Sequence, residues 1–260
     1  MDLGDVTIHY EERGSGPATY VFCHGLGGSG EGFERDDLDW YARHFRTIAW
    51  DNRGLGRSGQ AAKYSLPLYA GDLSRLLERL GIARAVIHGV SWGGVVAQRF
   101  AIDHPEQTAA LVLDSSSSET NVAASENWYL RGELARLGAR ALEGREVRPA
   151  FAGHATVAAS PEIPQVRPEH LDSYVAECRA TAALREHPLT PELWRITAPA
   201  LVVGGGKDTV AGAGGSVIMA RAIPGARLEI FQEAGHGVYA QARDGFRALL
   251  LEFLKPLALT

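Results

Sequence analysis

The chain has 260 residues, of which 45% are hydrophobic and 22% are charged, a composition that excludes an intrinsically disordered protein. Its formal net charge of -5 at pH 7 argues against a sequence-independent nucleic-acid-binding protein, because such a protein needs a basic face. The two cysteines, Cys23 and Cys178, are too few for a disulfide scaffold or a zinc site built from four thiolates.

The N-terminal segment, MDLGDVTIHY, contains neither the basic region nor the apolar region of a secretory signal. No uninterrupted apolar run in the chain reaches the length that crosses a bilayer. We therefore expect an intracellular, cytoplasmic protein with reduced thiols and no membrane partner.

Short apolar or β-branched runs alternate with amphipathic segments along the chain. Most of the later runs are continuously apolar, which is typical of strands covered on both faces of a parallel sheet. Between them, leucines recur at helical spacing within the expected helix Leu66–Leu80. The alternation predicts an α/β fold with a mostly parallel, doubly wound sheet. The expected strands are Val6–Tyr10, Thr19–Cys23, Thr47–Trp50, Ala85–His88, Ala110–Leu113, Ala200–Val203 and Arg227–Phe231, and further helices are expected over Trp92–His104 and Arg243–Leu254.

The segment 115–198 interrupts this alternation because it contains no convincing strand. It holds two stretches rich in Ala, Leu, Glu and Arg, Ser125–Leu142 and Glu169–His187, separated by a proline-rich connector from Pro161 to Pro168. A structureless loop of that length is uncommon inside a compact domain. We therefore expect a core domain formed by residues 1–114 and 199–260, and a helical cap, or lid, formed by residues 115–198.

The run Gly89-Val90-Ser91-Trp92-Gly93 follows an apolar strand and precedes a helix. A serine in such a Gly-x-Ser-x-Gly turn needs a very tight, strained backbone if its hydroxyl is to stand clear of the sheet. Glycine suits the two flanking positions because side chains there would collide. The helix that begins at Trp92 would direct its N–H groups and the positive end of its dipole toward an oxyanion formed beside Ser91. The pattern therefore predicts a nucleophilic serine.

Two possible partners of this serine also follow strands. Asp208 comes after the expected strand Ala200–Val203, and His236 comes after Arg227–Phe231. The carboxyl ends of parallel strands open onto one crevice. The chain order of serine, aspartate and histidine therefore predicts three side chains that meet at one edge of the sheet.

These motifs resemble the α/β-hydrolase fold superfamily, and the resemblance covers nearly the whole chain apart from the helical insertion. Its evidence is the Ser91 turn with Asp208 after a later strand, together with the runs Phe22-Cys23-His24-Gly25-Leu26-Gly27-Gly28, Asp51-Asn52-Arg53-Gly54-Leu55-Gly56-Arg57-Ser58 and Gly235-His236-Gly237. The resemblance implies an α/β-hydrolase core with a cap and a catalytic triad.

By this resemblance, Ser91 is the nucleophile and His236 accepts its proton and returns it to the leaving group. Asp208 orients the imidazole and stabilises its charged form. Asp114 stays open as an alternative acid, since some members of the superfamily place theirs after the corresponding strand; the glycine-rich loop before Asp208 favours Asp208. We interpret His24 as a support for its own loop.

The resemblance also implies an oxyanion hole formed by the backbone N–H groups of Leu26 and Trp92. Trp128, Tyr129 and Val238 are candidate pocket residues. No motif in the cap identifies the substrate.

The activity implied is that of a cofactor-free serine hydrolase that cleaves a small carboxylic ester or lactone through an acyl-enzyme. No metal is expected, and the expected partner is a small-molecule substrate, with the protein a monomer or homodimer. A carbon–carbon bond hydrolase, a proline-iminopeptidase-like peptidase and a haloperoxidase-like perhydrolase use the same triad and remain alternatives. A receptor that binds a small ligand with a slow triad is the non-enzymatic alternative; an intact triad argues against it.

Overall fold

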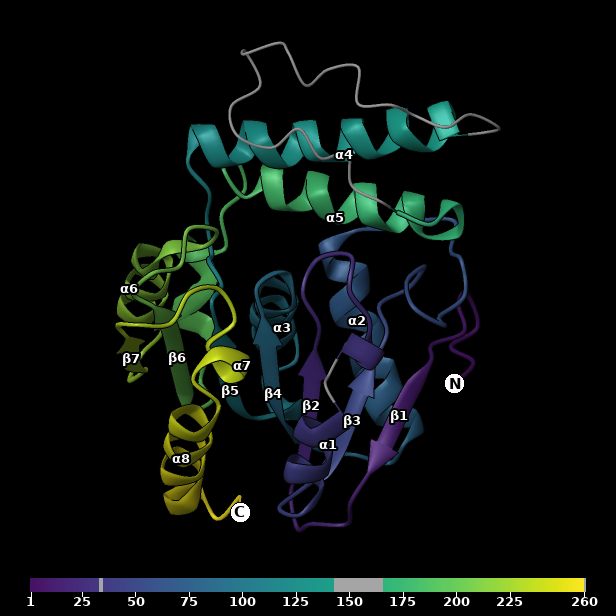
Figure 1. The fold of residues 1–260 in the computed structure, drawn as a ribbon. Coiled ribbons are helices and arrows are strands. Elements are labelled where there is room, and N and C mark those ends of the chain that lie inside the picture. The colour runs from purple at the N-terminus through teal and green to yellow at the C-terminus, as the bar shows by residue number, and fades with distance from the viewer. Residues whose placement is uncertain (33–34, 143–165, 260) are drawn as a thin grey trace.

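The structure, a computed structural model, describes residues 1–32, 35–142 and 166–259. The strands in these ranges are β1 (Tyr10–Arg13), β2 (Thr19–Cys23), β3 (Arg46–Trp50), β4 (Ala85–Val90), β5 (Thr108–Asp114), β6 (Ala200–Gly205) and β7 (Arg227–Phe231). They form one sheet in the order β1-β3-β2-β4-β5-β6-β7 (Figure 1). Only the β1–β3 pair is antiparallel among these strands. The prediction of a mostly parallel α/β sheet is therefore confirmed.

The first predicted strand, Val6–Tyr10, is wrong, because β1 begins where that prediction ends. Its two aliphatic side chains, Val6 and Ile8, are buried, and Ile8 is fully inaccessible. Its backbone, however, bonds to loops: the Thr7 carbonyl accepts from the Gly59 N–H at 2.8 Å, and the Ile8 N–H donates to Met1. The alternation of apolar and polar residues in this segment reflects the burial of every second side chain. It does not reflect pairing with a neighbouring strand of the sheet.

Helices cover both faces of the sheet, as expected for a doubly wound fold. One face carries α2 (Leu66–Arg79), α3 (Trp92–Asp103) and α6 (Gly212–Ala222), and the other carries α1 (Arg35–Ala42) and α8 (Arg243–Leu254). The remaining short helices are α7 (Val238–Gln241) and the 3-10 turns η1 (Gly30–Gly32), η2 (Pro105–Gln107), η3 (Pro168–His170), η4 (Thr190–Arg195) and η5 (Lys255–Leu257).

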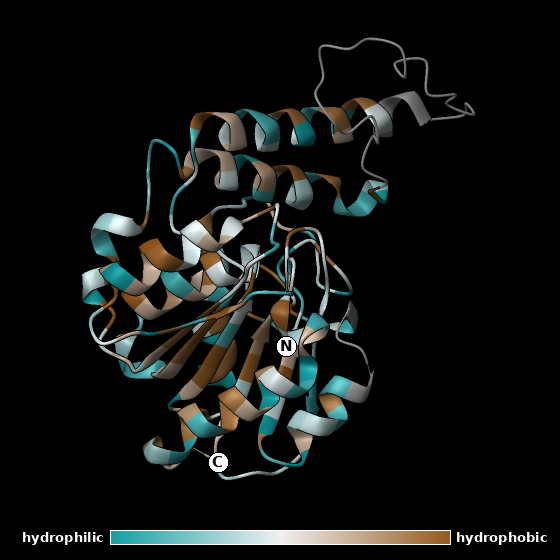
Figure 2. Cartoon of the chain, turned by 60° about the vertical axis from the view of Figure 1, so that its left-hand side comes forward, coloured by the Kyte–Doolittle hydropathy of each residue, from teal (hydrophilic) through white to brown (hydrophobic). Residues whose placement is uncertain are grey.

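The core lies on both faces of the central strands. Every residue of β4 and β6 is buried, and Figure 2 shows these strands as the most hydrophobic part of the ribbon, with hydrophilic residues on the outer faces of the helices. Burial on both faces explains why these strands are continuously apolar in the sequence. The two cysteines are free and buried.

Two long helices, α4 (Val122–Leu142) and α5 (Leu171–Ala183), pack against each other above the carboxyl ends of the strands (Figure 1). They occupy the part of the chain predicted to be a helical cap, while most of the connector from Pro161 to Pro168 lies outside the described residues. Near the end of the predicted cap, η4 does not belong to the pair of cap helices. Its Leu193 packs in the core cluster on the face of the sheet that α3 covers. In the described part of the chain, none of the helices combines the length and the apolar character needed to span a bilayer.

Candidate active site

Ser91 lies at the junction of β4 and α3 with backbone angles φ 55° and ψ -120°. A positive φ costs a residue with a Cβ atom of order 1–3 kcal/mol, so the surrounding structure must impose it. The crowding appears at the flanking glycines: a Cβ at Gly89 would lie 2.2 Å from the Gly93 carbonyl oxygen, and one at Gly93 would lie 2.0 Å from the Cys23 carbonyl oxygen. The two glycines therefore allow β4, α3 and the end of β2 to approach closely enough to form the turn.

The end of β5 holds this turn from the side. The Ser91 N–H donates to the Asp114 carbonyl at 2.9 Å, and the Ser116 hydroxyl donates to the Ser91 carbonyl at 2.8 Å. With both backbone groups of Ser91 bonded, the strained turn is fixed to the neighbouring strand. No sequence motif marks Ser116 for this role; its position after β5, at the same edge of the sheet as Ser91, is the signal that could have identified it.

His236 and Asp208 meet in the loops after β7 and β6. The Nδ1 atom of His236 lies 3.0 Å from Oδ2 of Asp208, and Oδ1 of Asp208 accepts from the N–H groups of Val210 at 2.8 Å and Ala211 at 3.1 Å. Burial alone would raise the pKa of Asp208, but the His236 imidazole and the two N–H groups outweigh it and keep that pKa below its ordinary value. The Asp208 carboxylate is thus positioned to hold one imidazole nitrogen as a donor and to leave the other for proton transfer.

Asp114, the alternative acid, bonds to the backbone that follows His236. Its carboxyl group is inaccessible and accepts hydrogen bonds from the Ser115 hydroxyl at 2.9 Å, the Val238 N–H at 3.1 Å and the Tyr239 N–H at 2.8 Å. Burial raises the pKa of Asp114 to about 6, although these three donors oppose the change. The structure therefore places Asp208 against the imidazole and gives Asp114 the position of an anchor for the histidine loop.

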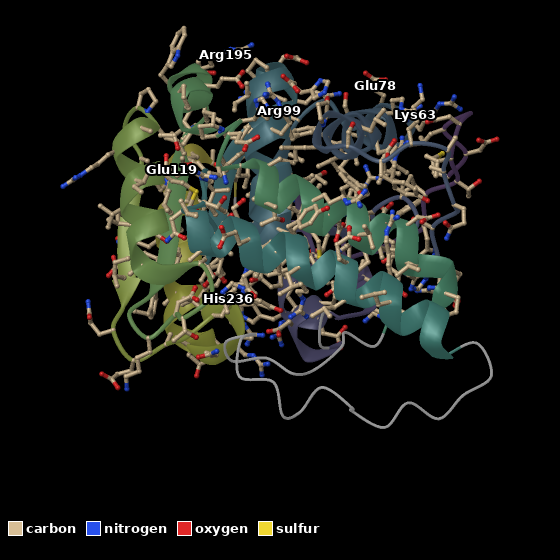
Figure 3. All side chains as sticks on the ribbon, turned by 90° about the horizontal axis from the view of Figure 1, so that it is seen from above. Lys63, Glu78, Arg99, Glu119, Arg195 and His236 are labelled. Atoms are coloured by element: carbon tan, nitrogen blue, oxygen red, sulfur yellow. The ribbon has the colours of Figure 1, made fainter. Side chains whose placement is uncertain are left out.

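Ser91 and His236 line the same cavity, which has a volume of about 1210 Å³ and lies between the sheet and the cap helix α4. In the view from above, His236 lies beside α4 (Figure 3). A second cavity of about 360 Å³ also reaches Ser91, but it extends under the cap toward Val95 and Leu184 and is not lined by His236. The serine therefore stands where two spaces of different size meet.

Of the three candidate pocket residues, only Trp128 lines these cavities. Tyr129 is 53% exposed and lies beside Arg179, because neighbouring residues on a helix point in different directions. Val238 is fully buried in the core cluster that α8 covers. The predicted pocket is therefore corrected at Tyr129 and Val238, which do not line either cavity.

The loop that carries Leu26 lies directly against the serine, since a Cβ at Gly25 would be 3.7 Å from the Ser91 Cβ. Nδ1 of His24 donates to the Gly25 carbonyl at 2.8 Å, and the Gly28 N–H donates to the same oxygen at 3.0 Å. In a trans peptide the N–H points away from the C=O, so these bonds set the direction of the Leu26 N–H. Burial lowers the pKa of His24, which keeps the ring neutral in its supporting role.

The chain is similar to known proteins over nearly its whole length. The family model described as the alpha/beta hydrolase fold matches residues 20–242. A 2-hydroxy-6-oxo-6-phenylhexa-2,4-dienoate hydrolase of Comamonas testosteroni is 28% identical, with 98% of this chain and 93% of the relative aligned.

Two solved structures are also similar over nearly their whole length. The enol-lactonase from Burkholderia xenovorans LB400 has a TM-score of 0.74 and 26% identity, covering 95% of this chain and 96% of that chain. Est816, described as an N-acyl homoserine lactone degrading enzyme, has a TM-score of 0.74 and 28% identity, covering 97% of this chain and 98% of that one. The chain belongs to the alpha/beta hydrolase fold family and is an enzyme of the hydrolase class.

Proposed function

We propose that this hydrolase cleaves a small carboxylic ester or lactone through an acyl-enzyme on Ser91. The observation that carries the proposal is the pairing of a strained serine with an aspartate-bound histidine in one cavity. Backbone strain at a residue that lines a cavity is characteristic of functional positions. The enol-lactonase and the N-acyl homoserine lactone degrading enzyme named above support the same substrate class.

The reaction would proceed in two steps. The Ser91 hydroxyl oxygen attacks the substrate carbonyl while Nε2 of His236 accepts its proton; the carbon–oxygen bond of the ester then breaks as the imidazolium returns the proton to the leaving alcohol. Water then gives a proton to His236 as it attacks the acyl carbon; the bond between that carbon and the Ser91 oxygen breaks, and the imidazolium returns the proton to the serine as the acid leaves. The N–H groups of Leu26 and Trp92 would stabilise the oxyanion in both steps, and such a donor typically contributes about 2.7–4 kcal/mol.

The two cavities suggest how the substrate lies. The leaving group must be close to His236, because that residue protonates it. Since His236 lines the 1210 Å³ cavity and not the 360 Å³ cavity, we assign the leaving group to the larger space and the acyl group to the smaller one. In an ester series that varies only the acyl chain, kcat/KM should fall once the chain is too long for the smaller cavity. In a series that varies only the alcohol, kcat/KM should change less.

The direct test combines turnover with labelling. The purified protein should hydrolyse p-nitrophenyl acetate for many turnovers and should become labelled on Ser91 by a fluorophosphonate probe, as located by peptide mass spectrometry. Ser91→Ala should remain folded and lose both properties. A label on another residue, or hydrolysis that survives this substitution, would refute the assignment, and a reaction that stops at one equivalent would favour the receptor alternative.

Carbon–carbon bond cleavage is the second candidate, because the Comamonas testosteroni relative is named for a dienoate substrate of that kind. Comparing kcat/KM for a γ-lactone, an aryl ester and a vinylogous 1,5-diketone on one protein sample separates the two chemistries.

A further inference from the structure

The loop that carries the proposed donor Leu26 touches the cap helix α5 at Gly27. Gly27 has φ +67°, and a Cβ there would lie 2.6 Å from Cδ2 of Tyr174. The Gly27 N–H donates to Oε2 of Glu177 at 2.8 Å. Tyr174 and Glu177 are three residues apart on one face of α5, so a single face of this helix contacts the loop by ring packing and by a hydrogen bond.

The Glu177 carboxylate also connects to the other side of the loop. Its Oε1 accepts from the side-chain amide of Asn52 at 2.8 Å. The backbone N–H of Asn52 donates to Nε2 of His24 at 3.0 Å, and His24 in turn donates to the Gly25 carbonyl. The cap carboxylate is therefore bonded, directly or through two residues, to the peptide groups on both sides of Leu26.

Glu177 is fully inaccessible, and in the described part of the chain it makes no ion pair with a basic residue. Burial raises the pKa of Glu177 to about 7, while the Gly27 N–H, the Asn52 amide and the Trp92 side chain act in the opposite direction. A buried carboxyl group is an unfavourable way to pack a cap against a core, since apolar side chains such as Leu184, which joins the core cluster, serve that purpose without a desolvation cost. The position of the acid therefore calls for a role beyond packing.

We propose that Glu177 is a positioning residue that holds the 24–28 loop so that the Leu26 N–H points at the oxyanion formed on Ser91. It does not line either cavity that reaches Ser91, so it acts through the loop and not on the substrate. This inference rests on the proposed function, because it gives the cap a part in the chemical step in addition to enclosing the substrate.

The test compares substitutions on the same face of α5. Glu177→Met keeps the length and apolar stem of the side chain but removes both acceptors. Misplacing a catalytic group by about 1 Å can cost about 100-fold, so we expect kcat on p-nitrophenyl acetate to fall by about 10- to 100-fold with KM changed by less than about threefold. Acylation by a fluorophosphonate should slow in the same proportion.

Glu177→Gln is the conservative variant. Its amide oxygen can accept from Gly27, and its amide N–H can donate to Oδ1 of a rotated Asn52 side chain, since that oxygen has no partner among the described residues. We expect kcat within about fivefold of the original protein, because both hydrogen bonds are restored.

Ser173→Ala is the matched control. Ser173 is also inaccessible, lies one turn earlier on α5, and donates to the Arg53 carbonyl at 2.7 Å, a contact between cap and core that does not involve the 24–28 loop. This variant should lose some thermal stability and keep its kcat.

Hydrogen exchange of the peptide that contains residues 24–28 gives a readout independent of turnover. Exchange should be about tenfold faster or more in Glu177→Met and unchanged in Ser173→Ala. If folded Glu177→Met shows unaltered exchange and the same kcat as Ser173→Ala, Glu177 only holds the cap and the inference is overturned. If the original protein does not hydrolyse esters at all while exchange responds as expected, the proposed function fails and the oxyanion role with it, and what stands is that Glu177 holds the 24–28 loop.

Discussion

The two proposed oxyanion donors are held by different parts of the molecule. The Trp92 N–H belongs to the first turn of α3, which is locked against β2 and β4 by the close approach at Gly89 and Gly93. The Leu26 N–H belongs to a loop whose contacts include a buried acid on the cap. The backbone that carries the first donor is held by close contacts within the core, whereas the loop that carries the second is hydrogen-bonded to the cap. A substitution on the cap face of α5 should therefore reach the second donor and leave the backbone of the serine turn in place.

The largest expected effect is a loss of kcat in a variant that alters the proposed triad and leaves both oxyanion donors unchanged. Asp208→Asn leaves the two N–H groups in place but no longer fixes the correct imidazole tautomer of His236, so kcat should fall by about 10⁴-fold with little change in stability. Asp114→Asn should instead weaken the anchor of the histidine loop and lower the free energy of unfolding by about 2 kcal/mol. Steady-state kinetics gives kcat and urea unfolding gives the free energy of unfolding for both variants. A greater loss of kcat in Asp114→Asn would reassign the triad acid.

The next effect contrasts the two glycines beside the donors. Gly93→Ala would place a Cβ 2.0 Å from a core carbonyl oxygen, which cannot move without displacing β2, so we expect a loss of more than about 3 kcal/mol of stability or failure to fold. In Gly27→Ala the new Cβ would contact the Tyr174 ring, and alanine would have to adopt a positive φ. We expect the free energy of unfolding to fall by about 1–2 kcal/mol. Thermal unfolding ranks the two variants.

Activity distinguishes them further. If the Leu26 loop depends on the cap, folded Gly27→Ala should lose at least about tenfold in kcat, although the variant is only mildly destabilised. Equal thermal stabilities for the two glycine variants would contradict the comparison between a core-fixed and a cap-fixed donor.

The remaining expected effect is a pH dependence of stability. The pKa of Glu177 is about 7 in the folded chain, above the ordinary glutamate value of 4.5, so between these values the native state binds a proton that the unfolded state releases. Stability from this group is therefore greatest at low pH and is lost as pH rises through 7. Between pH 5.5 and 8.5 the loss should be about 2 kcal/mol, less any contribution that relaxation of the site removes.

Urea unfolding of the original protein and Glu177→Gln at the two pH values isolates this contribution, because Asp114 and the other titrating groups are common to both proteins. The difference between the two proteins should change with pH in the stated direction. Parallel pH profiles would show that the cap acid does not titrate in this range.

The sequence was informative where short-range geometry decides the structure. The glycines around Ser91 and the strand ends before Asp208 and His236 are local features, and the structure places all of them at one edge of the sheet. Local patterns fail where the deciding contact is remote. The Glu177–Gly27 hydrogen bond joins residues 150 positions apart, and nothing in the sequence around a lone cap glutamate predicts it.

The wrong predictions have the same cause. The Val6–Tyr10 segment has the alternation of a strand, but its residues 6–9 exchange backbone hydrogen bonds with loops, and pairing with β3 begins at Tyr10. Tyr129 and Val238 have suitable side chains for a pocket, yet helix direction and core packing turn them elsewhere. Side-chain chemistry alone does not determine which cavity a residue faces.

The positive φ of Ser91 lowers the stability of the fold, yet the serine at this position is the proposed nucleophile. Glycine at this position would relieve about 1–3 kcal/mol of backbone strain while removing the nucleophile. Selection for heat resistance alone would therefore reward an inert protein, and any programme of thermostabilisation should screen for catalysis at every round.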